Sequence, residues 1–128
     1  MAKAMETPTP ETLVTLRARL ADFAARRDWD QFHSPKNLAM ALIAETAELV
    51  EHFQWLTTEQ SQQLPSVKLA EVRLELADIL IYLIRIADKL DVDLASAVLE
   101  KIAINEQRYP IDRVRGDARR AEEYPPDE

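Results

Sequence analysis

The chain has 128 residues, no cysteine, and 16 lysines and arginines against 23 acidic residues, which gives a formal net charge of −7. This charge disfavours binding to nucleic acid or to an anionic membrane, and the lack of cysteine excludes disulfides and thiolate chemistry. A single glycine, Gly116, is too few for tight β-turns or a glycine-rich phosphate loop, so we expect an all-α fold. No apolar run reaches the roughly 20 residues of a membrane span, and we expect one cytoplasmic protein domain.

The first helix is expected to begin after a short lead-in. Thr9 and Pro10 are typical of an N-cap and a first helical residue, and leucines at helical spacing continue the pattern to about Arg26. We interpret this helix as scaffold.

The next segment, residues 28–35, shows no helical period but contains Trp29 and His33. A tryptophan in such a loop either anchors the loop to the core or forms a stacking wall for a flat ligand, and the sequence leaves both roles open. For His33 a loop hydrogen bond is favoured over catalysis, because no acid or nucleophile lies at a telling spacing from it.

Two long helices are expected next, over residues 35–56, with Ser34 as the N-cap, and over residues 67–90. The polar segment 57–66 between them is predicted to be the loop of a helical hairpin. Residues 79–84 could form a buried strand locally, but the unbroken length of the second run favours a helix.

Each of these helices carries two acids three residues apart, Glu45 with Glu48 and Glu75 with Asp78. At roughly 100° per residue, Glu45 and Glu75 fall within apolar stripes, so the carboxylates are expected to point inward. Converging carboxylates repel one another and need a cation or protons, and few basic partners lie at matching positions. Oxygen ligands without cysteine or histidine suit Mg²⁺, with Mn²⁺ as the alternative. The opposing interpretations are two solvated acidic faces, or a di-iron bundle, whose Glu-x-x-His pairs are missing.

A fourth helix is expected over residues 94–109, which completes a four-helix bundle-like protomer. Its Lys101, Asn105 and Arg108 form a polar stripe, for which the spacing alone favours a solvated face. Residues 111–128 mix charge with glycine and proline and are expected to form a charged, flexible tail.

The helix over residues 35–56 has a second apolar face. Ile43 and Val50 lie opposite Glu45 and are too apolar for free solvent. A subunit contact would cover them, so we expect a homodimer or homotetramer that associates through helix faces.

Several motifs share their residues and spacing with one enzyme family. They are Arg27-Asp28-Trp29-Asp30-Gln31-Phe32-His33, Pro35-x-Asn37-Leu38-Ala39, Glu45-x-x-Glu48-Leu49, Phe53-Gln54-Trp55, the run from Glu75 to Leu83, and Lys101-x-x-x-Asn105-x-x-Arg108-Tyr109-Pro110. With them the chain resembles the MazG-like all-α nucleoside triphosphate pyrophosphohydrolases, and most of all their dCTP pyrophosphatase branch. The resemblance implies a family domain over residues 1–110.

The resemblance also implies a reaction and a set of site residues. A (deoxy)nucleoside triphosphate, with dCTP or a modified dCTP as candidates, would be hydrolysed to the monophosphate and pyrophosphate in nucleotide-pool house-cleaning. Mg²⁺ would be held by Glu45, Glu48, Glu75 and Asp78. Because Glu48 lies at the edge of the apolar stripe, where solvent can reach, we expect it to be catalytic together with Glu45. Candidate substrate-binding residues are Trp29, His33, Asn37, Trp55, Tyr82, Lys101, Asn105 and Arg108.

One departure from the family pattern concerns the base. Some relatives of the animal enzyme have a base-pocket histidine in the first helix where this chain has Leu20. A claim for cytosine is thereby weakened. The alternative function is a non-catalytic helical module that binds nucleotides or docks a partner, and only the enzyme predicts Mg²⁺-dependent release of pyrophosphate.

Overall fold

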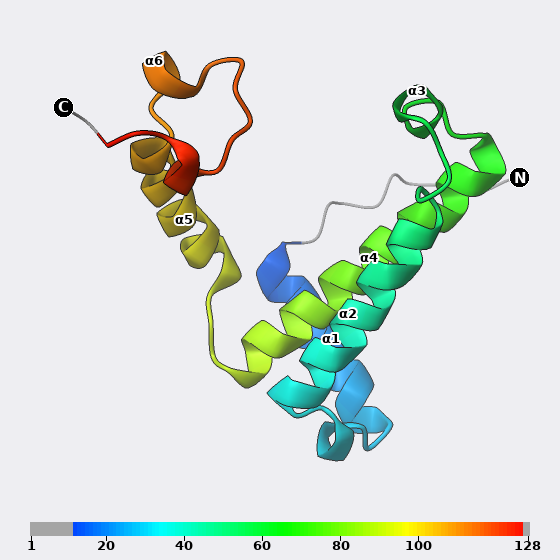
Figure 1. The fold of residues 1–128 in the computed structure, drawn as a ribbon. Helices are drawn as coiled ribbons and strands as arrows, with labels where there is room; N and C mark the ends of the chain where they lie inside the picture. The colour runs from blue at the N-terminus through cyan, green and yellow to red at the C-terminus, as the bar shows by residue number, and fades with distance from the viewer. Residues whose placement is uncertain (1–11, 127–128) are drawn as a thin grey trace, which may run out of the picture. The chain divides into compact units, whose positions relative to one another are not determined.

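The computed structural model describes residues 12–126, which contain helices and turns but no strand (Figure 1). The helical elements are α1 Leu13–Arg26, η1 Asp30–Phe32, α2 Pro35–Glu51, α3 Thr58–Ser61, α4 Ser66–Lys89, α5 Leu94–Arg108, α6 Ile111–Val114 and η2 Ala121–Glu123. The predicted all-α class is confirmed, and the four long helices occur where the sequence placed them. Among the described residues, no helix has both the length and the apolar character needed to span a bilayer.

The described chain forms two compact units, one that ends at Val92 and one that begins at Asp93. The first unit holds α1 to α4, and the second holds α5, α6 and η2. In the first unit α4 packs against both α2 and α1, and α2 and α4 run side by side as a helical hairpin (Figure 1). This hairpin carries all four of the predicted metal-binding acids.

Helix starts follow the capping signals of the sequence. The Ser34 side chain accepts a hydrogen bond from the Asn37 amide, and Pro35 follows as the first residue of α2, as predicted. At α1 the observed N-cap is Thr12, whereas the cap expected at Thr9 lies outside the described residues.

The end of α2 and the loop after it differ from the expected ones. Helix α2 ends at Glu51 instead of near residue 56, and the following four residues form turns. His52, at the C-cap, lies 3.3 Å from the Lys68 amine of α4 and 3.8 Å from the Glu71 carboxylate, so contacts between helices accompany the early end. The expected hairpin loop, residues 57–66, contains the short helix α3.

The C-terminal segment, which shows no helical period in the sequence, nevertheless has short helical elements. It contains α6 and η2, and the Tyr109 hydroxyl accepts a hydrogen bond from the Ala121 amide at 3.1 Å. Asp117 accepts hydrogen bonds from the amide and the guanidinium of Arg119. These contacts stabilise turns that cannot be recognised in the sequence, because the segment has no hydrophobic period. Its flexibility stays a prediction.

The buried apolar core of the described residues is small and lies within the first unit. Its members are Ala24, Leu38, Val72, Ile84 and Ala87. Large apolar side chains on α2 remain exposed, including Ile43 at 70% and Val50 at 54%. The predicted second apolar face of α2 is therefore uncovered within the protomer.

Candidate functional site

Three of the four predicted acids converge between α2 and α4. Glu45 and Glu48 of α2 and Glu75 of α4 each offer a carboxylate oxygen, and these three atoms lie within 4.8 Å of one another. Asp78 of α4 is not part of this trio, but its negative charge contributes to the raised pKa of Glu45. The i, i+3 spacing on two packed helices therefore gathers negative charge at one place, as the sequence predicted.

Glu45 and Glu75 are half-buried and incompletely satisfied. Burial raises the pKa of Glu45 to about 7, and interactions with Glu48, repulsion by Asp78 and a hydrogen bond with Glu75 add to the shift. One oxygen of Glu45 and one of Glu75, Oε2 in each case, is buried without a hydrogen-bond partner among the described residues. Buried acceptors of this kind need a donor or a cation.

This donor set fits a hard divalent cation. The trio supplies only carboxylate oxygens, and within residues 12–126 no lysine or arginine forms an ion pair with these three acids. A bound cation would give the two unpartnered oxygens, Oε2 of Glu45 and of Glu75, the partner that no protein group provides. Glu48 is exposed, so water can reach the trio from that side.

A pocket of about 300 Å³ opens beside the acids and is lined by Glu45 and Asp78. Flat side chains, Trp29, His33 and Tyr82 among them, form much of its wall. Phe23 also lines it and meets Trp29 edge to face, with ring centroids 5.7 Å apart. A cavity with aromatic walls next to a cation-binding cluster can hold a flat ring whose substituent reaches the cation.

The structure brings some predicted substrate-binding residues together and not others. Trp29, His33 and Tyr82 share the pocket with the acids. Trp55 follows the early end of α2, is 86% exposed and does not line this pocket. The Asn37 side chain donates to the Phe32 carbonyl, so it holds the η1 turn.

The other three predicted substrate-binding residues belong to α5 in the second unit. There Arg108 forms a 2.6 Å ion pair with Glu122, while Lys101 is exposed and Asn105 is half-buried. Their predicted contact with phosphate stays a prediction.

The sequence analysis overlooked Arg85, which lines the pocket with a side chain only 4% exposed. Its guanidinium donates to Asp88 Oδ2 at 3.1 Å and to Asp30 Oδ1 at 3.0 Å. A single charged residue inside the apolar run 79–86 is the signal that could have revealed it, because a lone buried charge needs partners.

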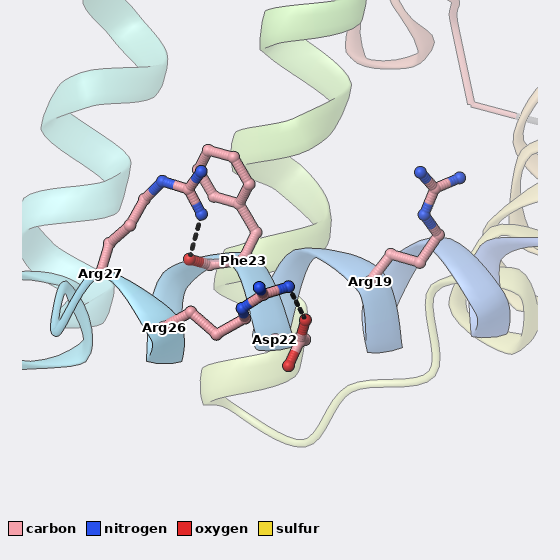
Figure 2. Close-up of a pocket in the computed structure, with 5 residues that line it drawn as sticks. All are labelled: Arg19, Asp22, Phe23, Arg26 and Arg27. Atoms are coloured by element: carbon pink, nitrogen blue, oxygen red, sulfur yellow. Dashed lines mark hydrogen bonds and ion pairs between the residues drawn. The ribbon is translucent and has the colours of Figure 1, made fainter.

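An open basic groove lies along α1 (Figure 2). Three arginines, Arg19, Arg26 and Arg27, line it with Asp22 and Phe23. Arg26 pairs with Asp22 at 3.6 Å, and Arg27 donates to the Phe23 carbonyl at 3.1 Å (Figure 2). The Arg27 guanidinium also lies 3.5 Å from the centroid of the Phe23 ring. Because Phe23 lines the pocket as well, Arg27 steadies one of its aromatic walls.

Comparison with known proteins decides the family. Residues 41–123 match the MazG-like family, a range that includes all four acids and α5. The chain belongs to the MazG-like family. The resemblance found in the sequence motifs is thereby confirmed.

The relatives of this MazG-like chain include two mammalian enzymes. It is 48% identical over 113 residues to dCTP pyrophosphatase 1 of Mus musculus, which covers 87% of this chain and 66% of the relative. It is 45% identical over 120 residues to dCTP pyrophosphatase 1 of Homo sapiens, with 92% and 70% covered. The chain thus spans about two thirds of the length of these relatives.

A solved structure shares the fold of this MazG-like chain. The crystal structure of a pyrophosphatase from Archaeoglobus fulgidus is similar with a TM-score of 0.74 and 34% sequence identity. The similarity covers 82% of this chain and 98% of the archaeal one. This chain therefore shares its fold with a solved pyrophosphatase.

Proposed function

We propose that this chain is a Mg²⁺-dependent nucleoside triphosphate pyrophosphohydrolase, with dCTP or a modified dCTP as the first candidate substrate. The observation that carries the proposal is the trio of carboxylates beside an aromatic pocket. The acidic cluster, through a cation, would bind the polyphosphate of a nucleotide, and the adjoining aromatic walls would bind its base. The printed activities of the relatives, dCTP pyrophosphatase and pyrophosphatase, support the same reaction.

Glu45, Glu48 and Glu75 would hold the cation, with Asp78 as the fourth acid. When bound, Mg²⁺ supplies positive charge that offsets the negative charge developing on the phosphoryl group under attack. Without that charge, four acids in a chain of net charge −7 would repel the triphosphate. Mn²⁺ fits the same oxygen ligands and is the alternative cation.

Glu48 is the member of the trio best placed to activate water, because it is exposed while its two neighbours are half-buried. Its carboxylate would orient a water molecule and accept a proton as the water oxygen attacks the α-phosphorus in line. The bond between the α-phosphorus and the oxygen that bridges to the β-phosphorus then breaks. Nucleoside monophosphate and pyrophosphate are the products.

Trp29 and Tyr82 would hold the base in the pocket, with Phe23 as a further aromatic wall. Leu20 lines the same pocket and cannot form a hydrogen bond with the base through its side chain. Polar groups other than the Leu20 side chain must therefore recognise the base. Lys101, Asn105 and Arg108 are kept as candidate phosphate-binding residues on the strength of the family motif.

A product assay tests this function. The full chain would be incubated with dCTP, 5-methyl-dCTP and the other common triphosphates, with Mg²⁺, with Mn²⁺ or with a chelator, and the products separated by ion-exchange chromatography. We expect monophosphate and pyrophosphate in equal amounts, and no turnover with the chelator. Nucleotide binding without turnover of any substrate would contradict the proposal and favour the non-catalytic binding module.

A further inference from the structure

One wall of the pocket carries the positive charge of Arg85, whereas Glu45 and Asp78 on the same pocket are acids. The buried guanidinium of Arg85 donates from Nη1 to Asp88 and from Nη2 to Asp30, and Nη2 also lies 3.3 Å from Nδ1 of His33. Lys89 also donates to Asp30 at 2.8 Å, and Arg17 donates to Asp88 at 2.6 Å. Both carboxylates therefore fix the guanidinium in place beside the histidine ring.

This contact determines which nitrogen of His33 carries the proton. An arginine side chain has only hydrogen-bond donors and stays charged, so Nδ1 of His33 must be the acceptor. A neutral imidazole that accepts at Nδ1 carries its hydrogen on Nε2. Protonation of Nδ1 would place two donors and two positive charges against each other.

The charges around His33 favour the neutral ring. Burial lowers the pKa of His33, and the positive charges of Arg85 and Lys89 lower it further, while Asp30 acts in the opposite direction. The neutral form is therefore the dominant one near pH 7. It leaves Nε2–H as the only N–H of this ring.

The Nε2–H group of His33 has no protein partner in the described part of the chain. His33 is half-buried and lines the pocket, where its ring lies 6.1 Å from the Trp29 ring, centroid to centroid. A donor on the wall of a cavity with aromatic sides is suited to an acceptor on the edge of a flat ligand. Leu20, on the same pocket, offers no competing hydrogen bond.

We propose that Arg85 is a positioning residue that fixes His33 as a neutral Nε2–H donor, and that this donor binds an acceptor on the pyrimidine ring, N3 or O2. This inference rests on the proposed function for the identity of the ligand. His33 then selects the base, and Arg85 acts on the base only through His33.

The tautomer can be measured without substrate. In the full chain labelled with ¹⁵N, long-range proton–nitrogen spectra distinguish a ring with Nε2–H from one with Nδ1–H. We expect Nε2–H in the wild type, a mixture of tautomers in Arg85→Met, and recovery of Nε2–H in Arg85→Lys, which restores a donor. Nδ1–H in the wild type, or an unchanged spectrum in folded Arg85→Met, would overturn the inference.

Kinetics test the contact with the base and do not depend on whether the Arg85 variants fold. His33→Phe keeps a flat ring without a donor, and we expect KM for dCTP to rise about tenfold, with a smaller change in kcat. His33→Gln restores an N–H and should recover most of that loss. An unchanged KM in His33→Phe would overturn the contact.

Substrate analogues identify the acceptor. In the wild type, 3-deaza-dCTP, which lacks N3, or 2-thio-dCTP, in which O2 is replaced by a weaker acceptor, should raise KM about tenfold. In His33→Phe that penalty should disappear, whereas an equal penalty in both proteins would overturn the proposal. A wild type that shows Nε2–H but hydrolyses no triphosphate would instead contradict the proposed function. Failure of this inference can therefore be distinguished from failure of the proposed function.

Discussion

Glu45 lies in an environment that disfavours its charged form. It is half-buried, its pKa is raised to about 7, and its Oε2 has no partner among residues 12–126. A structural carboxylate would be paired with a base or exposed to water. Glu45 is neither, which is typical of a group whose partner is a ligand.

Removal of one charge from the trio separates activity from stability. Glu48→Gln should lower activity by at least about 100-fold, because the group that orients and deprotonates water is lost. Without Mg²⁺, its melting temperature should rise by a few degrees, because repulsion between Glu48 and Glu45 is relieved. Product assays and thermal unfolding monitored by circular dichroism measure the two effects.

The matched control for that variant is Glu51→Gln, an exposed acid at the end of α2 that is not part of the trio. It should leave both activity and melting temperature unchanged. Full activity in Glu48→Gln, together with a wild-type melting temperature that does not change when millimolar Mg²⁺ is added, would contradict the metal site.

The pH dependence of stability offers a second test at Glu45. Its pKa in the folded state, about 7, lies above the ordinary value of 4.5, so the folded protein binds the proton more tightly than the unfolded chain. The metal-free protein should therefore lose stability as pH rises from about 4.5 to about 7. Thermal unfolding of wild type and Glu45→Gln across this range isolates the effect, because the variant lacks the titrating group. A constant difference between the two proteins would contradict the shifted pKa.

At the residue scale, the sequence revealed the acids but not the polar wall of the pocket. Glu45 and Glu75 were identifiable because they interrupt apolar stripes at a helical period. Arg85 is the single charged residue in the apolar run 79–86, but its partner Asp30 lies 55 positions away and only the packing of α4 against the η1 turn brings them together. The contact between Trp29 and Phe23 was also not predicted from the sequence.

At the scale of elements, the α2–α4 hairpin provides all four acids of the site. Its caps and its apolar period were readable from the sequence, and the competition between helix and strand in residues 79–84 was resolved correctly by length. The end of α2 was not readable, because Phe53 and Leu56 continue the apolar pattern beyond Glu51 without a glycine or proline to stop it. Trp55, a candidate substrate-binding residue, therefore lies in the turns after α2 and not in the helix itself.

The uncovered face of α2 predicts a subunit contact. If Ile43 and Val50, which are 70% and 54% exposed, meet a second copy, Val50→Lys should dissociate the oligomer, because an unpaired charge is costly in an apolar interface. Sedimentation velocity of the wild type and the variant measures the change. Val14→Lys, at an exposed valine of α1, is the matched control and should leave the oligomer intact. A monomeric wild type would end this proposal.

At the scale of the whole molecule, composition determined the fold class and little else. The single glycine favoured helices, which the structure confirms, whereas the division at Val92 and Asp93 has no signal in composition. The turn there depends on Asp91, whose φ of 53° places it in the left-handed region that aspartate tolerates better than most residues. The predicted family domain over residues 1–110 stays a prediction.

The central claim is that water attacks the α-phosphorus of a nucleoside triphosphate held between the acids and the aromatic pocket. Hydrolysis of dCTP in ¹⁸O-labelled water, followed by mass spectrometry of both products, tests it most directly. We predict the label in the nucleoside monophosphate and none in pyrophosphate, because the attacking oxygen stays on the phosphorus it reaches. Label in pyrophosphate would place the attack at the β-phosphorus and contradict the geometry, and orthophosphate as the first product would contradict the whole account.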